Sequence, residues 1–209
     1  TASSPDRTLA YAKAVVAGEI VAGPHVRNAC RRHIADLKRK DGIWFDHDAA
    51  GHAFAFFEEV LKLSEGQFEG QPFELQPSQA FILGALFGWK RKDGTRKYRT
   101  VFIAVPRKAG KTTLAAGLAV YALFCDGELG AQVINAAADR EQAALCFDAA
   151  KGMVQAEPML DGRSEVFKRS IIVPNTGSAY KVISSEAYSK HGLSCSYIGA
   201  DELHAWPDR

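Results

Sequence analysis

One stretch constrains the fold of this 209-residue chain more than any other, because it places a basic, glycine-containing loop between two apolar segments. The segment before the loop, YRTVFIAV (98–105), is apolar and β-branched, which predicts a buried strand. The segment after it, TTLAAGLAVYALFC (112–125), repeats apolar residues at helical spacing. The loop ends in Gly-Lys-Thr, the end of a phosphate-binding loop. This order predicts an α/β fold with the loop at the carboxyl edge of a sheet.

The rest of the second half continues the alternation of strands and helices. Residues 131–138 and 194–202 have the composition of strands, and the second of these is predicted to be buried. Residues 139–154 have helical spacing, with Asp139 as the predicted N-cap. Residues 167–185 are predicted to form a hairpin around Asn175-Thr176-Gly177. We therefore expect a mostly parallel sheet flanked by helices.

The first third of the chain is predicted to be helical. Apolar residues recur at steps of three and four in residues 6–20, 25–40 and 48–63. The glycine-rich stretch SEGQFEGQPFE that follows is typical of a linker. We predict a small helical segment with its linker over residues 1–70 and a nucleotide-binding domain over residues 71–209.

The composition excludes several classes of protein. No apolar run reaches the ~18 residues that a membrane span needs, and the first residues do not have the pattern of a secretory signal. The four cysteines are scattered, which favours reduced thiols over disulfides or zinc. His47 and His52 are metal-ligand types at a spacing that does not favour a metal site.

The loop supplies the groups that bind a nucleotide phosphate. Gly110 allows close approach of the backbone, Lys111 neutralises phosphate oxygens, and the Thr112 hydroxyl binds Mg²⁺. The first glycine of the usual pattern is replaced by Val105, and Val105-Pro106 makes the turn differently because proline fixes φ. This departure weakens the match to the usual pattern but removes no group that contacts phosphate.

Two acids complete the predicted chemistry. Asp201 and Glu202 follow the strand YIGA, where nucleotide hydrolysis needs one acid for the Mg²⁺ shell and a second group for the attacking water. We expect the two side chains to diverge, so that one faces the metal ion and the other the water.

A basic stretch lies before the loop. Residues 90–99, KRKDGTRKYR, hold six basic side chains around an Asp-Gly turn. Lysine and arginine bind nucleic acid by displacing counterions from its phosphates. A contact to DNA or to another subunit through Lys90, Arg91 and Lys92 and a solvated hairpin are both compatible with this charge.

Several segments together resemble the large terminase subunit of tailed bacteriophages. They occur in order over nearly the whole chain: YAKAVVAGEIVAGPHVRNACRRHIADL, PFELQPSQAFILGALFGWK, DGTRKYRTVFIAVPRKAGKTTLAAGLAVYAL, AAADREQAALCFDAAKGMV and HGLSCSYIGADELHAW. The resemblance implies a P-loop NTPase of the ASCE or RecA-like type, with Walker A and Walker B motifs, that hydrolyses ATP with Mg²⁺. It also implies a motor that translocates double-stranded DNA into a procapsid.

The resemblance also assigns roles to residues. It implies that Gln79 reads adenine, with Phe73 as a stacking neighbour, and that Arg107 senses the γ-phosphate. Asp201 matches the metal-shell acid beside Thr112, and Glu202 matches the catalytic acid, acting with Lys111 and Arg107. The expected nucleotide-binding set is Gln79, Arg107, Lys108, Ala109, Gly110, Lys111, Thr112 and Thr113.

The implied partners are double-stranded DNA, the portal protein, the small terminase subunit and further copies of the chain in a ring. No membrane is involved, and the implied location is the cytoplasm of the infected bacterial host, at the procapsid portal during packaging. Some terminases act on a neighbour's nucleotide with an arginine before the last strand. Here Lys190 is the nearest cation to that position, and Arg140 is a second choice.

The chain ends at DELHAWPDR, soon after the acidic pair. We therefore expect a fragment that lacks the nuclease domain, turns over ATP weakly or not at all, and does not cleave DNA. Two alternatives stay open at this point. DELH also matches the acidic box of a helicase superfamily, which duplex unwinding would reveal. A nucleotide-binding assembly module would bind ATP without turnover.

Overall fold

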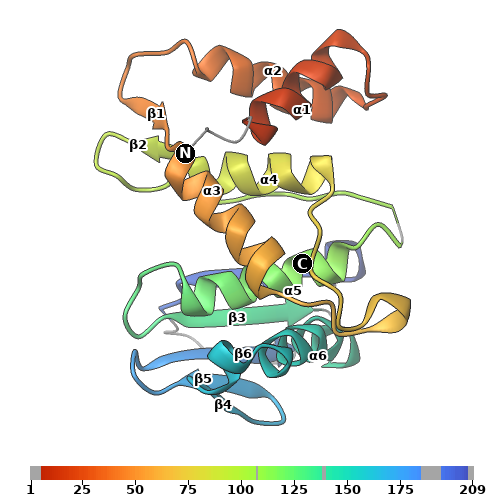
Figure 1. Ribbon diagram of the computed structural model, residues 1–209, viewed down its shortest axis with the longest axis vertical. Helices are drawn as coiled ribbons and strands as arrows, with labels where there is room; N and C mark the ends of the chain where they lie inside the picture. The colour runs from red at the N-terminus through yellow and green to blue at the C-terminus, as the bar shows by residue number, and fades with distance from the viewer. Residues whose placement is uncertain (1–5, 107, 138–139, 185–193, 207–209) are drawn as a thin grey trace. The chain divides into compact units, whose positions relative to one another are not determined.

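The computed structural model describes residues 6–106, 108–137, 140–184 and 194–206 (Figure 1). The chain forms two compact units, and neither is one continuous stretch. The first unit comprises Thr1–Glu58 and Glu74–Ala104, and the second comprises Glu59–Phe73 and Val105–Arg209. The chain therefore passes between the units three times. Within the described residues, no helix is both long and apolar enough to cross a membrane.

The first unit is mainly helical. Asp6 and Asp46 cap two of its helices, because their side chains accept hydrogen bonds from the amides of Leu9 and Ala49, both at 3.0 Å. Residues 43–45 lie in the stretch predicted to be helical, and they form a short strand instead. The elements are α1 (Arg7–Ala17), α2 (Pro24–Asp36), β1 (Ile43–Phe45), α3 (His47–Ala55), α4 (Pro77–Gly88) and β2 (Trp89–Arg91).

A close approach between α1 and α4 builds the core of this unit. A Cβ at Gly84 would lie 1.9 Å from Oγ1 of Thr8, so only glycine fits at this position of α4. Beside it, Ala12, Val15 and Cys30 pack with Phe81. Burial raises the pKa of Cys30 to about 11.

The second unit holds an α/β sheet, which confirms the predicted fold class. A short π-helical turn (Phe56–Val60) spans the first boundary between the units, and a 3₁₀ turn (Gly66–Phe68) of the second unit precedes the sheet in the chain. The remaining elements of this unit are α5 (Lys111–Phe124), β3 (Gln132–Ala137), α6 (Arg140–Ala156), α7 (Pro158–Asp161), β4 (Glu165–Val166), β5 (Ser170–Val173), β6 (Ser178–Ser184), β7 (Tyr197–Ala200) and a 3₁₀ turn (Leu203–Ala205).

The sheet has the strand order β4-β5-β6-β3-β7, and Figure 1 shows β3, β6, β5 and β4 side by side in that sequence. β3 pairs in parallel with both β6 and β7, whereas β4, β5 and β6 pair antiparallel. The sheet is therefore mixed. The predicted hairpin around Asn175-Thr176-Gly177 is confirmed, because Val173 lies opposite Ser178. Helices α5 and α6 contact each other, and both contact β3.

The stretch Glu59–Phe73 is fastened to α6. The Ser64 hydroxyl donates to the carbonyl of Ala149 at 3.0 Å, and Lys62 Nζ donates to the carbonyl of Ala156 at 3.3 Å. A Cβ at Gly152 would lie 2.4 Å from Cβ of Ser64. The missing side chain at Gly152 therefore makes the space that Ser64 occupies.

Two sequence predictions about strands are wrong. The apolar run 98–105 contains no strand, and Val101, Phe102 and Val105 are exposed. An apolar run becomes a strand only where a neighbouring strand supplies hydrogen-bond partners, and none does so here among the described residues. β7 is a strand but is not fully buried: in the described part of the chain it pairs with β3 alone, and Ile198 is exposed.

The structure extends the interpretation of α5. The sequence indicated a helix with apolar residues at helical spacing, and the structure buries nearly every residue from Leu114 to Leu123. A helix that is apolar on all sides is a core helix. Its first residue is therefore fixed in place by the packing of the residues that follow it.

Candidate nucleotide-binding site

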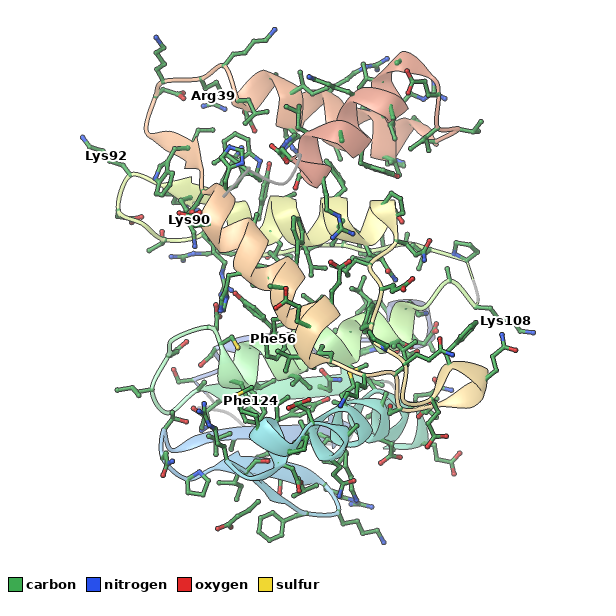
Figure 2. The ribbon with its side chains drawn as sticks, viewed as in Figure 1. Arg39, Phe56, Lys90, Lys92, Lys108 and Phe124 are labelled. Atoms are coloured by element: carbon green, nitrogen blue, oxygen red, sulfur yellow. The ribbon has the colours of Figure 1, made fainter. Side chains whose placement is uncertain are left out.

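The loop before α5 has the backbone conformation of an anion site. Gly110 is the N-cap of α5 with φ 72°, and Lys108 also has a positive φ of 64°. The first hydrogen bond of the helix joins the Leu114 amide to the Gly110 carbonyl at 2.9 Å. The amides of residues 111–113 precede that bond, so they are the donors that a helix start leaves free for an anion. Lys108 is exposed, and Figure 2 shows its side chain extending away from the ribbon.

A buried thiol supports the helix start from α6. Sγ of Cys146 lies 3.9 Å from the carbonyl oxygen of Thr112, to which the thiol donates. Burial raises the pKa of Cys146 to about 12, so the thiol keeps the proton that it donates. Contacts on this side therefore hold Thr112 in the first turn of α5.

The acidic pair follows β7 in a backbone fixed by three hydrogen bonds. The Asp201 amide donates to the carbonyl of Ala136 on β3 at 2.9 Å, and the Glu202 amide donates to Oδ1 of Asp201 at 2.8 Å. The indole N–H of Trp206 donates to the carbonyl of Asp201 at 2.9 Å. Glu202 has φ 49°, a strained value for a residue with a Cβ. Backbone strain of this kind is typical of functional positions.

Both acids turn toward the loop lysine. Nζ of Lys111 donates a short hydrogen bond to Oε1 of Glu202 and lies 3.6 Å from Oδ1 of Asp201. The hydrogen bond to Glu202 is the main cause that raises the pKa of Lys111 above its ordinary value. The prediction that the two carboxylates diverge is therefore wrong for this structure, because Lys111 attracts both of them. Lys111 and Glu202 meet in the structure although they lie 91 positions apart in the chain.

The three charged groups are partly open to solvent. The side chains of Lys111, Asp201 and Glu202 are 31%, 20% and 29% exposed. A ligand can therefore reach each of them. Thr112 and Thr113 are half-buried in the first turn of the helix, and Ala109 is exposed in the loop.

The predicted adenine reader has a different role in this structure. Gln79 belongs to the first unit, where its Oε1 accepts from the Gln76 amide at 3.0 Å and closes a capping box at the start of α4. The side chain of Phe73 is buried, which leaves no exposed ring face for a base. The adenine role of Gln79 stays a prediction.

Several predicted residues lie outside the described part of the chain. Arg107, Lys190 and the proposed N-cap Asp139 are not described, and neither is the side chain of Arg140 at the start of α6. Among the described residues, no group of three or more His, Cys, Asp or Glu is placed to hold a metal ion. All four cysteines lie in the described part of the chain, where they are free thiols, as their scattered spacing predicted.

The comparisons with known proteins decide the family. The sequence model described as "Terminase large subunit, ATPase domain" matches residues 77–209, which is more than half of the chain. The chain belongs to the terminase large-subunit ATPase family. This result supports the terminase resemblance and goes against the helicase alternative that DELH left open.

A curated relative and a solved structure agree with this assignment. The chain is 32% identical over 144 residues to the "Terminase, large subunit" of Enterobacteria phage HK97, a match that covers 67% of the chain and 27% of the relative. It is also similar to the crystal structure of the HK97 bacteriophage large terminase, with a TM-score of 0.61 and 28% identity, over 72% of this chain and 30% of that one. The chain thus matches less than a third of either relative.

Sequence reasoning missed two supporting residues. Trp206 fixes the carbonyl of Asp201, and Cys146 fixes the carbonyl of Thr112. Both are apolar types that usually pack in a core. No signal in the sequence marks Cys146, whereas Trp206 follows the acidic pair closely enough to suggest a local contact.

Proposed function

We propose that this chain hydrolyses ATP and couples the hydrolysis to movement of double-stranded viral DNA into a procapsid. The observation that carries the proposal is the meeting of Lys111, from the start of a buried helix, with Asp201 and Glu202, from the end of a parallel strand. The ATPase family of the chain supports this interpretation of the three groups. The proposed ATPase domain is 71–209, preceded by the helical segment 1–70.

The residues present fit a nucleotide with Mg²⁺. Three amides without a partner inside the helix and the Lys111 ammonium offer donors to phosphate oxygens. The Thr112 hydroxyl and the Asp201 carboxylate are oxygen ligands of the kind that Mg²⁺ prefers. The bound nucleotide supplies the phosphoryl group whose transfer to water the protein catalyses. Thr113, next to Thr112, and the loop residues Lys108 and Ala109 would also contact the nucleotide.

The chain's own residues divide the work. Lys111 leaves the two carboxylates and neutralises phosphate oxygens. Glu202 would then accept a proton from water, as a general base must. Asp201 keeps its position through its own amide and carbonyl bonds, so it can hold the metal shell while Glu202 moves. Arg107 would sense the γ-phosphate, and Gln79 would have to exchange its cap bond for adenine.

The wider role rests on the same family assignment. We propose double-stranded DNA, the portal protein and the small terminase subunit as partners, with the chain in a homo-oligomeric ring in the host cytoplasm. Lys190 or Arg140 would act on the nucleotide of a neighbouring copy. Each of these is a proposal for the whole protein, of which the chain matches a part.

The decisive experiment is the substitution of the loop lysine. In the whole protein, Lys111→Ala should weaken Mg-ATP binding and abolish hydrolysis, measured by calorimetry and by phosphate release with and without duplex DNA. Lys168→Ala, which removes an exposed lysine from the turn between β4 and β5, is the matched control and should behave as wild type. Equal ATP binding and turnover in the Lys111 variant and wild type would overturn the proposal.

A further inference from the structure

The two-stranded sheet of the first unit has one face in its core and one face outside. β1 and β2 pair antiparallel, with Phe45 opposite Trp89 and Trp44 opposite Lys90. Phe45 and Trp89 form the inner pair, with their ring centroids 5.3 Å apart, and Trp89 is fully buried. Residues directly opposite one another share a face, so Trp44 and Lys90 form the outer pair. On the edge of β2 that does not pair with β1, an isolated antiparallel bridge joins Lys90 to Arg96.

The outer face carries an unusual residue for a small sheet. The Trp44 side chain is 49% exposed, although tryptophan is the residue with the largest apolar area to bury. Tryptophan on a surface is typical of binding faces, because one rigid ring gives a large contact area. Trp44 is therefore the first sign that this face meets a partner.

Lysines occur in the segments on either side of the ribbon that carries Trp44. Lys38 and Lys40 lie in the exposed loop before β1, and Lys92 follows β2. A Cβ at Gly42 would lie 3.8 Å from Cβ of Lys92, so this loop and the β2 turn are in contact. Figure 2 shows Lys90 and Lys92 at the same end of the first unit as Arg39, with the Lys92 side chain extending away from the ribbon.

The acids near this face already have partners. Asp36 binds Lys97 and Arg39, Asp41 binds Arg39, and Asp93 accepts from Thr95. In the part of the chain that the structure describes, no ion pair joins Lys38, Lys40, Lys90 or Lys92 to a carboxylate. These four charges are therefore available to an outside anion.

The charge of the whole unit has the same sign. The first unit has 14 Lys and Arg and nine Asp and Glu, a formal charge of +5, whereas the second has 12 and 15, a formal charge of −3. The net charge of +2 hides this separation. A positive unit with a local excess of lysine is the electrostatic footprint of a nucleic-acid contact.

We propose that the outer face of the β1–β2 ribbon, defined by Lys38, Lys40, Trp44, Lys90 and Lys92, binds the sugar-phosphate backbone of duplex DNA. The lysines neutralise phosphates, and Trp44 packs its ring on the sugars between them. The inference rests on the proposed function for its choice of duplex DNA. It adds a surface and an aromatic contact that take no part in the ATP chemistry.

Salt dependence tests the lysines. Affinity for a labelled 30-base-pair duplex is measured by fluorescence anisotropy over a salt series, without nucleotide, for wild type and for the variant with Lys38, Lys40, Lys90 and Lys92 changed to Gln. The slope of log K against log salt should become shallower by ~0.9 for each phosphate that the variant no longer neutralises. The double variant K168Q/R169Q, in the exposed turn between β4 and β5, is the matched control and should keep the wild-type slope.

A second pair of variants tests the aromatic contact. Trp44→Ala should weaken duplex binding by about fivefold or more at unchanged salt slope, and Trp44→Phe should restore most of the affinity. Phe167→Ala removes an exposed aromatic beside Lys168 and Arg169 and should have no effect. Thermal unfolding of each variant shows whether it has folded.

The outcomes separate the possibilities. Unchanged affinity and slope in folded ribbon variants would overturn the proposal. Loss of self-association without a change in DNA affinity would overturn it in favour of a second copy of the chain, whose negative unit would be the partner. The two proposals can also fail separately. If Lys111→Ala has normal ATP turnover while the ribbon variants lose DNA binding, the proposed ATPase site is wrong and this inference stands.

Discussion

Lys97 and Lys111 both bind carboxylates, but in different surroundings. Lys97, in the first unit, binds Asp36, and its ammonium lies 4.9 Å from the ring centroids of both Trp89 and Tyr98. The side chains of Lys97 and Asp36 are 18% and 5% exposed. Lys111, in the second unit, binds Glu202 beside Asp201, and all three groups are partly open.

The ratio of charges differs as well. Around Asp36, two cations meet one carboxylate, because Arg39 also donates to it at 3.1 Å. Lys111 itself, among the described residues, pairs with two carboxylates. The first cluster is complete and enclosed by aromatic rings, so it stabilises the fold. The second is open to solvent, which supports the proposed exchange of its internal ion pair for a ligand that brings a divalent cation and phosphates.

The largest expected effect tests the exchange at Lys111. Glu202→Gln should lower ATP turnover by a factor of ~10² or more, because the general base is removed. The same change removes the anion that holds Lys111, so ATP affinity should not fall and should rise severalfold. Turnover is measured by phosphate release and affinity by calorimetry. Asp201→Asn is the contrasting variant, in which Mg²⁺-dependent binding should weaken. Normal hydrolysis by Glu202→Gln would place the base elsewhere.

The next effect concerns stability. Lys97→Met leaves Asp36 with one partner in a buried site and should lower the free energy of unfolding by about 2–3 kcal/mol. Lys111→Met, at the more open cluster, should lower it by less than about 0.5 kcal/mol. Urea unfolding of both variants measures the two losses. Equal losses would show that the two lysines serve the fold alike.

A buried histidine beside the Lys97 cluster gives a smaller, pH-dependent effect. His33 accepts from Nε1 of Trp89 at 3.0 Å, and burial lowers its pKa below the ordinary 6.5. The unfolded chain therefore binds a proton that the folded chain does not bind, so stability is complete above pH 6.5 and falls as the pH drops toward the folded pKa.

Melting temperatures between pH 7.5 and 5 check this dependence. The melting temperature of wild type should fall below pH 6.5, whereas His33→Gln, which keeps an acceptor for Trp89, should fall less steeply. His25→Gln, at an exposed position of α2, should follow wild type. A wild-type curve that is flat across this range would contradict the inference.

The smallest effect is expected at an exposed pair. Asp41 binds Arg39 at 2.5 Å, but the two side chains are largely open to water. Exposed ion pairs contribute little, because water and salt screen them. Asp41→Ala should therefore melt within experimental error of wild type, despite the short distance between its carboxylate and the guanidinium. A large decrease in stability would show that distance matters more than burial here.

The sequence predicted local features well and distant ones poorly. The start of α5, the acids after β7 and the hairpin at Asn175 depend on neighbouring residues, and each was found. The run 98–105 has the composition of a strand, but pairing depends on a partner that composition does not reveal. Likewise, Asp36 and Lys97 meet across 61 residues, and only the folded chain brings them together.

The interleaved course of the chain limits how its gene can be recombined. A chimaera joined at residue 70 would take Ser64 from one parent and Gly152 from the other. Ser64 fits, however, only because Gly152 has no side chain. A parent with alanine at position 152 would collide with the inherited serine. These two positions must therefore be inherited together, and viable crossovers should preserve the pairing even where the surrounding sequences diverge.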